Sequence, residues 1–193
     1  MIYPEFGSIF SKYCKGANTP DGAISAMQLA LTEFWRLFQE YYSIGKFNFT
    51  GAAITGPTTV TMAGVLGSFN SATQLNVPNT SYIKSVLHGG GDPFVNLFKL
   101  FSYTLNMSIW QIDCKAAGFM TPYVATIKTD FTAQAAEFKT KMYSLAPTTH
   151  EEAMDILSAG VKDCLQTVIA VVPYLGTAGA TTLTGTMTIQ FGL

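Results

Sequence analysis

Two long stretches of the sequence contain no charged residue, and this feature limits what the chain can fold into. The first stretch runs from Phe47 to Ile83, and the second covers the tail from Gly176 to Leu193. Strands and loops on the surface of a monomer normally carry charges, which stop strand edges from pairing with other chains and keep the protein soluble. We therefore expect both stretches to be covered, either by the rest of the chain or by neighbouring subunits.

The residue types in both stretches predict β-strands. Thr58–Met62 are mostly β-branched and follow the Gly56–Pro57 pair, a composition that favours a strand after a turn. We predict β-segments over residues 47–66 and 177–191. Residues 68–81 read as a loop, and a loop is difficult to bury within its own chain, so coverage by neighbouring subunits is the favoured interpretation.

In most of the remaining sequence, apolar residues recur at three- and four-residue spacing, which is typical of amphipathic helices. Four helices are predicted, over residues 20–45, 93–112, 122–145 and 149–172. Three of them have a recognisable N-terminal signal: Thr19 before Pro20, Asp92 before Pro93, and a capping box of Thr149 and Glu152. Trp35 and Trp110 lie in the densest aromatic stretches of two of these helices, so we predict that both are buried.

The predicted elements indicate a single α+β domain over residues 1–193, with a core of about four helices and two Thr/Gly-rich β-segments. An all-helical core with extended arms is the alternative. The chain has 193 residues, of which 48% are hydrophobic. A chain of this length and composition can bury a substantial core, which excludes intrinsic disorder.

Charge and cysteine usage limit the partners. The 11 basic and 12 acidic residues give a net charge of −1, which leaves no electrostatic footprint for nucleic acid or anionic lipid. No run of about 18 apolar residues is present, so no membrane partner is expected. The N-terminal residues also lack the pattern of a secretory signal. The three cysteines show no metal-ligand spacing, so we expect free thiols, no metal and no cofactor.

One glycine-rich motif raises the question of catalysis. His88–Gly91 resembles the oxyanion loop of some α/β-hydrolases, in which backbone N–H groups stabilise a developing negative charge. Such enzymes also need a G-x-S-x-G nucleophile motif, which the sequence lacks. A loop before the Asp92 cap is therefore the favoured interpretation, and a small hydrolase that uses His88 is an alternative function.

A second alternative is a ligand-binding domain with an aromatic pocket. The residues that would line it are Phe34, Trp35, Phe98 and Trp110. They follow the apolar spacing of their helices, which is more typical of a packed core.

A capped helix followed by an uncharged Gly/Thr segment occurs in both halves of the chain, as in TPDGAISAMQLALTEFWRLF and TTHEEAMDILSAGVKDCL. Internal duplication and convergent composition explain this echo equally well. The texture resembles the small virion structural proteins of tailed bacteriophages, such as tail, neck and baseplate components. The resemblance implies a non-enzymatic subunit, found in the virion after assembly in the host cytoplasm. Its partners would be copies of itself and other structural subunits.

The β-segments supply the predicted subunit interface. Uncharged strand edges are able to recruit another chain by strand addition. Alternating residues share one face of an extended strand, so Met187, Ile189 and Phe191 would lie on the same face. The predicted interface residues are Val60, Met62, Leu183, Met187, Ile189 and Phe191.

Overall fold

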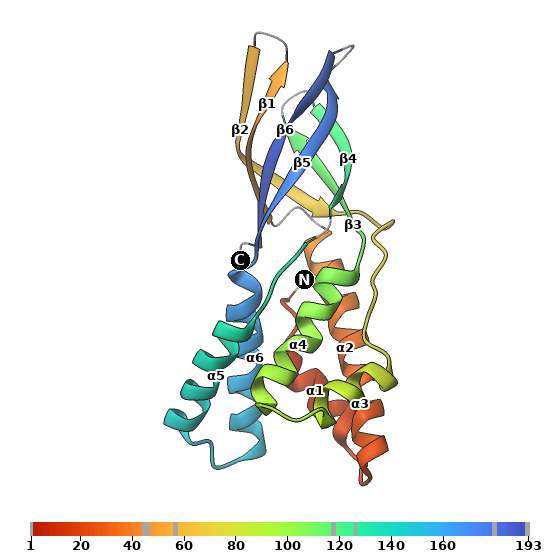
Figure 1. Ribbon diagram of the computed structural model, residues 1–193, viewed down its shortest axis with the longest axis vertical. Helices are drawn as coiled ribbons and strands as arrows, with labels where there is room; N and C mark the ends of the chain where they lie inside the picture. Colours follow the sequence, from red (N-terminus) through yellow and green to blue (C-terminus); the bar gives the residue numbers. More distant parts are fainter. Residues whose placement is uncertain are drawn as a thin grey trace.

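A computed structural model describes residues 2–43, 47–55, 58–116, 119–125, 127–178 and 181–191. Side chains are described for residues 2–43, 67–113, 127–169 and 190–191. The described chain has two halves along its long axis (Figure 1): a helical half, made of all the helices, and a sheet half, made of all the strands. The prediction of an α+β fold is confirmed, and the all-helical alternative is wrong.

The described part of the helical half contains six helices. They are α1 (Phe6–Cys14), α2 (Pro20–Tyr42), α3 (Thr80–His88), α4 (Pro93–Met107), α5 (Thr132–Leu145) and α6 (His150–Gln166). Helices α1 and α3 have only nine residues each and are not among the four predicted helices. The predicted end of α2 near Gly45 lies outside the described residues.

The three predicted N-terminal signals are confirmed. Thr19 accepts a hydrogen bond from the Gly22 N–H at the start of α2, and Asp92 accepts from two backbone N–H groups at the start of α4. Thr149 and Glu152 form the capping box of α6. Each cap satisfies backbone donors that the first turn of a helix leaves free.

The sheet half is one antiparallel sheet with the strand order β4-β3-β2-β1-β6-β5. Its strands are β1 (Phe47–Thr55), β2 (Thr58–Phe69), β3 (Trp110–Ala116), β4 (Phe119–Ala125), β5 (Ile169–Ala178) and β6 (Thr181–Gln190). The two predicted β-segments are confirmed as strands, and they pair with each other, since β1 lies between β2 and β6. The predicted turn at Gly56–Pro57 lies outside the described residues.

The sheet curls so that its two edge strands, β4 and β5, approach each other (Figure 1). Each edge strand contains a proline, Pro122 in β4 and Pro173 in β5. Proline has no N–H to donate, which confines it to edges and irregular positions of sheets. Pro173, the predicted end of a helix, lies inside strand β5.

Three predicted helix boundaries are wrong for a common reason. Helix α4 ends at Met107, and the residues from Trp110 onward, Cys114 included, form β3. Helix α6 ends at Gln166, and residues 169–172 belong to β5. The predicted helix over residues 122–145 starts only at Thr132, after β4. In each case a short apolar run next to a helix fits a strand as well as a helix, and periodicity alone does not separate the two.

The core lies between the helices and extends into the base of the sheet. Helix α2 contributes its central aromatic residues, among them Phe34, Trp35 and Phe38, all fully buried. Trp110 at the start of β3 is also fully buried, with its ring centroid 6.1 Å from that of Trp35, which confirms both tryptophan predictions. Phe69 and Phe191, at the ends of β2 and β6, pack against Phe38. The two halves therefore share one core.

Candidate functional site

Strand register divides the sheet into two faces. Residues directly opposite each other in an antiparallel pair share a face, and faces alternate along each strand. Phe69 pairs with Ile112, and both are buried in the core. Gln190 pairs with Ile169, and both are exposed. We call the face of Phe69 and Ile112 the core-side face and the face of Gln190 and Ile169 the outer face.

All six predicted interface positions lie on the core-side face. Met62 and Met187 both pair with Gly51, and Ile189 pairs with Phe49. Val60 and Leu183 follow by alternation along β2 and β6. Phe191 continues the same face past the end of β6, with only 1% of its surface exposed among core aromatic rings. Phe191 is therefore a core residue of its own chain, and its assignment to a subunit interface is wrong.

The predicted route of assembly through strand edges also fails for these segments. Strand β1 is paired with β2 and β6, and β6 is paired with β1 and β5. Strand β2 is likewise paired on both sides. Because all three strands are interior, they have no open row of backbone groups to offer a second chain.

The outer face differs between strands. On β6 its positions are threonines at every second residue from Thr182 to Thr188, followed by Gln190. On the two edge strands they are apolar except for Thr177 near the end of β5, so these strands have apolar residues on both faces. We call these positions the edge-strand surface: Met120, Pro122 and Val124 on β4, and Ile169, Val171, Pro173 and Leu175 on β5.

An antiparallel strand with one solvated face normally alternates apolar and polar residues, as β6 does, whereas a strand covered on both faces is apolar throughout. Strands β4 and β5 have the second pattern apart from Thr121 and Thr177. Among the described elements, α2 is the one helix with substantial contact to a strand, and that strand is β2. Ile169, the edge-strand residue whose side chain is described, is 59% exposed. Within the described chain, the edge-strand surface therefore lacks a helical cover.

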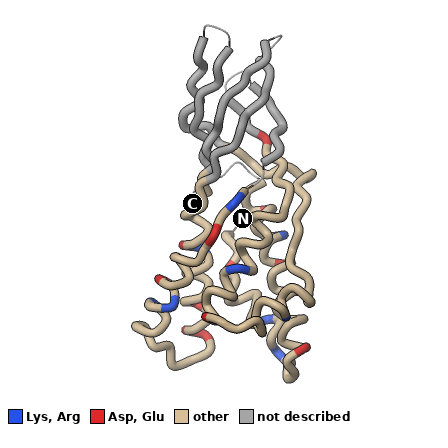
Figure 2. Tube along the Cα trace, in the orientation of Figure 1, with Lys and Arg blue, Asp and Glu red and all other residues tan. Residues whose placement is uncertain are grey.

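Charge is distributed very unevenly between the halves. Of the 11 basic and 12 acidic residues, only Asp113 and Lys115 fall in any of the six described strands. The described charged residues of the helical half are spread over its helices (Figure 2). Many form ion pairs there, such as Lys12 with Glu33 at 2.8 Å and Lys139 with Asp92 at 2.5 Å.

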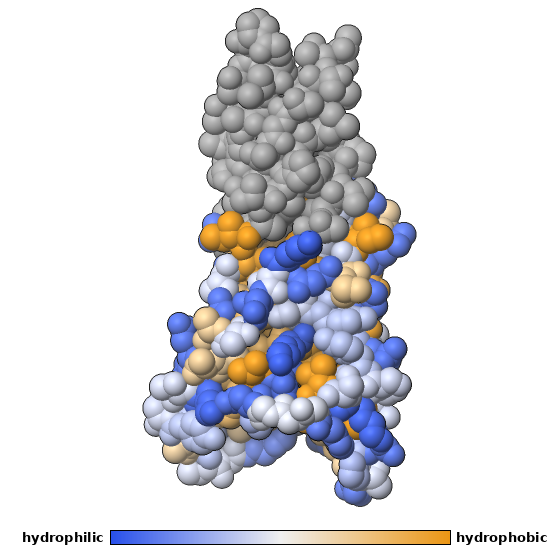
Figure 3. Space-filling view, viewed as in Figure 1, coloured by the Kyte–Doolittle hydropathy of each residue, from blue (hydrophilic) through white to orange (hydrophobic). Residues whose placement is uncertain are grey.

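Exposed apolar side chains occur where the two halves meet. Met107 at the end of α4 and Ile109 just before β3 are 53% and 41% exposed, and Ile169 begins β5. The space-filling view shows apolar groups at the two sides of this boundary, with hydrophilic surface between them (Figure 3).

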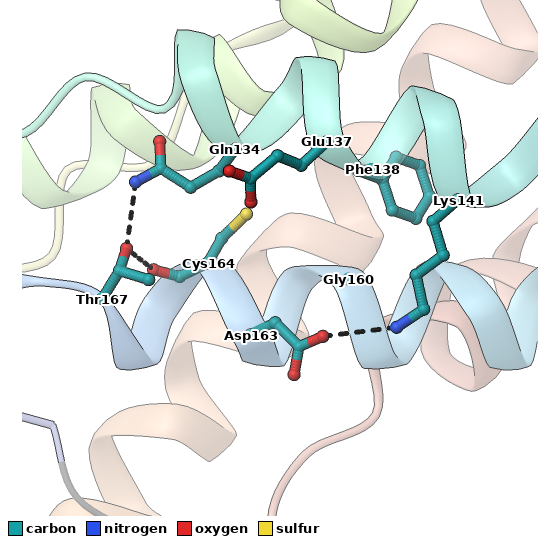
Figure 4. A pocket seen from close by; sticks show the side chains of 8 residues that line it. All are labelled: Gln134, Glu137, Phe138, Lys141, Gly160, Asp163, Cys164 and Thr167. Atoms are coloured by element: carbon teal, nitrogen blue, oxygen red, sulfur yellow. Dashed lines mark hydrogen bonds and ion pairs between the residues drawn. The ribbon is translucent and has the colours of Figure 1, made fainter.

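A cavity of about 130 Å³ lies between α5 and α6 (Figure 4). Phe138 packs against Gly160 so closely that a Cβ at position 160 would lie 2.2 Å from the ring. The cavity also contains polar groups: Gln134 donates to the Thr167 hydroxyl over 3.2 Å, and Lys141 lies 3.4 Å from Asp163. Because residue 160 has no side chain, Gly160 lets α5 and α6 approach closely at Phe138.

The thiol of Cys164 is the candidate nucleophile of this cavity. Burial raises the pKa of Cys164 to about 12, and the nearby carboxylates of Asp163 and Glu137 add to the increase. Figure 4 shows the Glu137 side chain pointing toward this thiol. A thiol with this pKa remains protonated near neutral pH and is a poor nucleophile.

A serine–histidine contact is present on the surface and was not predicted. Ser11 in α1 lies 3.0 Å from Nε2 of His150, the first residue of α6, and both side chains are solvent-accessible. Within the described part of the chain, no carboxylate is hydrogen-bonded to the His150 ring to orient it as in a catalytic triad. The two residues are 139 positions apart, so no local pattern in the sequence could have indicated the pair.

The His88 loop has a structural role in positioning α4. His88 is exposed at the end of α3, and Gly90 and Gly91 adopt positive φ angles of 79° and 88°, which glycine tolerates best. Asn96 donates to the Gly90 carbonyl over 2.9 Å. Asp92 accepts from backbone N–H groups of α4 and from Lys139, and these hydrogen bonds, the one from Lys139 first, lower the pKa of the Asp92 carboxyl.

The aromatic residues of the alternative pocket fill the core. Phe34, Trp35, Phe98 and Trp110 are each at most 1% exposed. The Phe34 and Trp35 ring centroids are 5.4 Å apart in an edge-on arrangement. Side chains, and not a binding cavity, occupy this space.

The described residues contain no group of three or more His, Cys, Asp or Glu side chains placed to hold a metal ion. None of the described helices is long and apolar enough to cross a membrane. No protein-family model, curated protein or solved structure matches the chain.

Proposed function

We propose that the protein is a non-enzymatic structural subunit of a multi-subunit particle, in which neighbouring subunits cover its sheet half. The observation that carries the proposal is the sheet itself: six strands with two charged residues project from a charged helical half, and α2 alone among the described helices packs substantially on them. A sheet that faced only water would normally carry charges along its edges and outer face.

The helical half and the sheet half would then have separate roles. The helical half is closed by an aromatic core and by capped, ion-paired helices. It supplies a stable base that holds the sheet in place through Phe69, Trp110 and Phe191. The sheet half supplies the contacts to other subunits.

The type of particle follows from the resemblance of the sequence. Its capped helices followed by uncharged Gly/Thr segments are similar in style to virion proteins of tailed bacteriophages, so we propose a tail, neck or baseplate component. Its partners would be copies of itself and other structural subunits, and its location the virion.

The non-enzymatic role is supported by the chemistry of the candidate sites. The Cys164 thiol is held protonated by burial, and His150 contacts Ser11 on an open surface. We expect ester, peptide and glycoside substrates to be turned over no faster than in buffer. A hydrolysis that His88→Ala or His150→Ala abolished would overturn this part of the proposal.

Assembly is tested on the wild-type chain by light scattering and negative-stain electron microscopy over a range of concentrations. We expect particles of more than two copies with a regular shape. Limited proteolysis supplies a second readout, because residues 169–178 on the edge strand β5 should become more resistant as the chain assembles. A chain that remains a monomer at every concentration, with residues 169–178 already resistant, would need no neighbouring subunit to protect its sheet and would contradict the proposal.

A further inference from the structure

We infer that the edge-strand surface is where a second copy of this chain packs, with the outer face of one sheet against the outer face of the other. The inference rests on the proposed function and names the partner and the surface. It starts from the edge strands, in which apolar residues occupy both faces, although one face has no described helix over it.

The comparison of β5 with its neighbour β6 isolates this feature. Val171 pairs with Thr188 and Pro173 pairs with Thr186, and Ile169 pairs with Gln190, so these apolar outer positions of β5 lie beside polar residues of β6. Both strands lie in the same sheet and at the same height. Because only β5 departs from the apolar–polar alternation of a half-solvated strand, the departure points to a contact over β5 and not to a general property of the sheet.

The prolines exclude contact through the sheet edges. Strand addition needs a continuous row of backbone donors and acceptors along an edge. Pro122 and Pro173 each interrupt that row on their edge strand, and the two edges already approach each other. A partner is therefore received on the outer face, in the way two sheets pack in a sandwich.

The partner has to be uncharged over the area of contact, since burying an unpaired charge is unfavourable. Strands β4, β5 and β6 of this chain meet that condition, and its helical half does not. The charged outer-face positions Asp113 and Lys115 of β3 lie beside Pro122 and Met120 and bound the surface on that side. Pairing one edge-strand surface with the same surface of a second copy is self-complementary about a twofold axis. The ten residues of β5 extend about 33 Å, and with a strand on each side the surface is about 14 Å wide. Its projected area of about 460 Å² is within a factor of two of the roughly 800 Å² per partner that stable interfaces bury.

The test compares two pairs of substitutions on the outer face. Ile169→Glu with Val171→Lys charges the edge-strand surface. Thr59→Glu with Thr61→Lys places the same charges on β2, which is three strands from β5 and two from β4 in the sheet. Sedimentation equilibrium measures the dissociation constant, and circular dichroism checks the fold. The first pair should raise the dissociation constant at least 100-fold, and the second by less than about threefold.

The single variant Ile169→Gln guards against a misfolded double variant, since this side chain is 59% exposed. It should raise the dissociation constant about tenfold and leave the circular dichroism spectrum unchanged. If the substitutions at Ile169 and Val171 left the dissociation constant unchanged, or if the β2 pair raised it as much, the inference would be overturned. The proposed function would be unaffected by that result. A wild-type chain that forms dimers and nothing larger would support the inference and contradict the particle. A chain that remains a monomer would overturn both.

Discussion

In a stable protein, polar groups need hydrogen-bond or ionic partners and apolar side chains need cover from water. The helical half and the sheet half differ in how they meet these needs. In the helical half, helix caps and ion pairs such as Lys12–Glu33 satisfy the polar groups, and the aromatic rings are turned inward. The sheet half has almost no charge, and its edge strands are apolar on both faces. The helical half therefore has the charged surface of a domain that faces water. The sheet half has the composition of a surface that another molecule covers.

The difference also locates the function. In the described chain, the polar sites with recognisable chemistry, including the Cys164 cavity and the Ser11–His150 contact, all lie in the helical half. They are accounted for by helix packing and capping. The feature that packing within the chain does not explain is the apolar outer face of the edge strands. Four experiments test how far the two halves differ in packing and charge.

The largest expected effect tests whether the halves share one core. Trp110 joins them, because its ring centroid lies 4.8 Å from that of Phe69 and its indole N–H donates to the Leu105 carbonyl. Trp110→Ala should lower the free energy of unfolding by about 3–5 kcal/mol, measured by chemical denaturation. A sheet signal that was lost while the helical signal remained unchanged would show that the halves are separate folding units.

The second experiment sharpens the contrast between the two faces of the sheet. Ile189 and Thr188 are neighbours in β6, but the first lies on the core-side face and the second on the outer face. Ile189→Lys should lower the free energy of unfolding by about 2–4 kcal/mol, because it places a charge on the face that continues into the core. Thr188→Lys should change it by less than about 0.5 kcal/mol. Equal losses in the two variants would contradict the assignment of faces.

The third experiment concerns how tightly the helical half is packed. Gly7 in α1 lies against α6, where an added Cβ would be 2.0 Å from the Met154 carbonyl oxygen, and its N–H donates to Ser158. Gly7→Ala should lower the free energy of unfolding by about 1–3 kcal/mol, because the two backbones would have to separate. Ser8→Ala, at the exposed next position, is the control and should be nearly neutral.

The smallest effect is expected from pH and is confined to the charged half. The hydrogen bond from Lys139 and two backbone N–H groups lower the pKa of Asp92 in the folded state. The resulting stabilisation is present above the ordinary pKa of a carboxyl group and is lost as the pH falls through the lowered value. Asp92→Asn should therefore make the melting temperature depend less steeply on pH in the acid range. Lys139→Met removes the largest cause of the shift and should flatten the curve in the same direction.

The sequence predicts the starts of elements better than their ends. Thr19, Asp92 and Thr149 were identifiable because a capping residue acts on its own first turn, and the structure confirms all three. The end of α6 was not identifiable, because Val168–Val172 continue the apolar pattern of the helix although the chain changes to a strand at Ile169. Short apolar runs of this kind fit either period.

The candidate site was predicted in part for the same reason. The uncharged β-segments were correctly identified as strands, but pairing between β1 and β6 depends on contacts across the whole sheet. Without that register, Met187 and Ile189 could not be assigned to the core-side face. The edge-strand surface was missed because Ile169 and Val171 were assigned to a helix that ended at Pro173.

The position of β6 has a consequence for how the molecule is made. It follows every other described element along the chain, yet it lies between β1 and β5, and Ile54 pairs with Thr184. On a ribosome, β1 and β2 would emerge and form their hairpin long before β6 is synthesised. Pairings over such sequence separations form slowly, so the hairpin would present an uncharged open edge throughout that interval. The nascent chain should therefore be most prone to aggregation, and most dependent on chaperones, in the period before β6 is released.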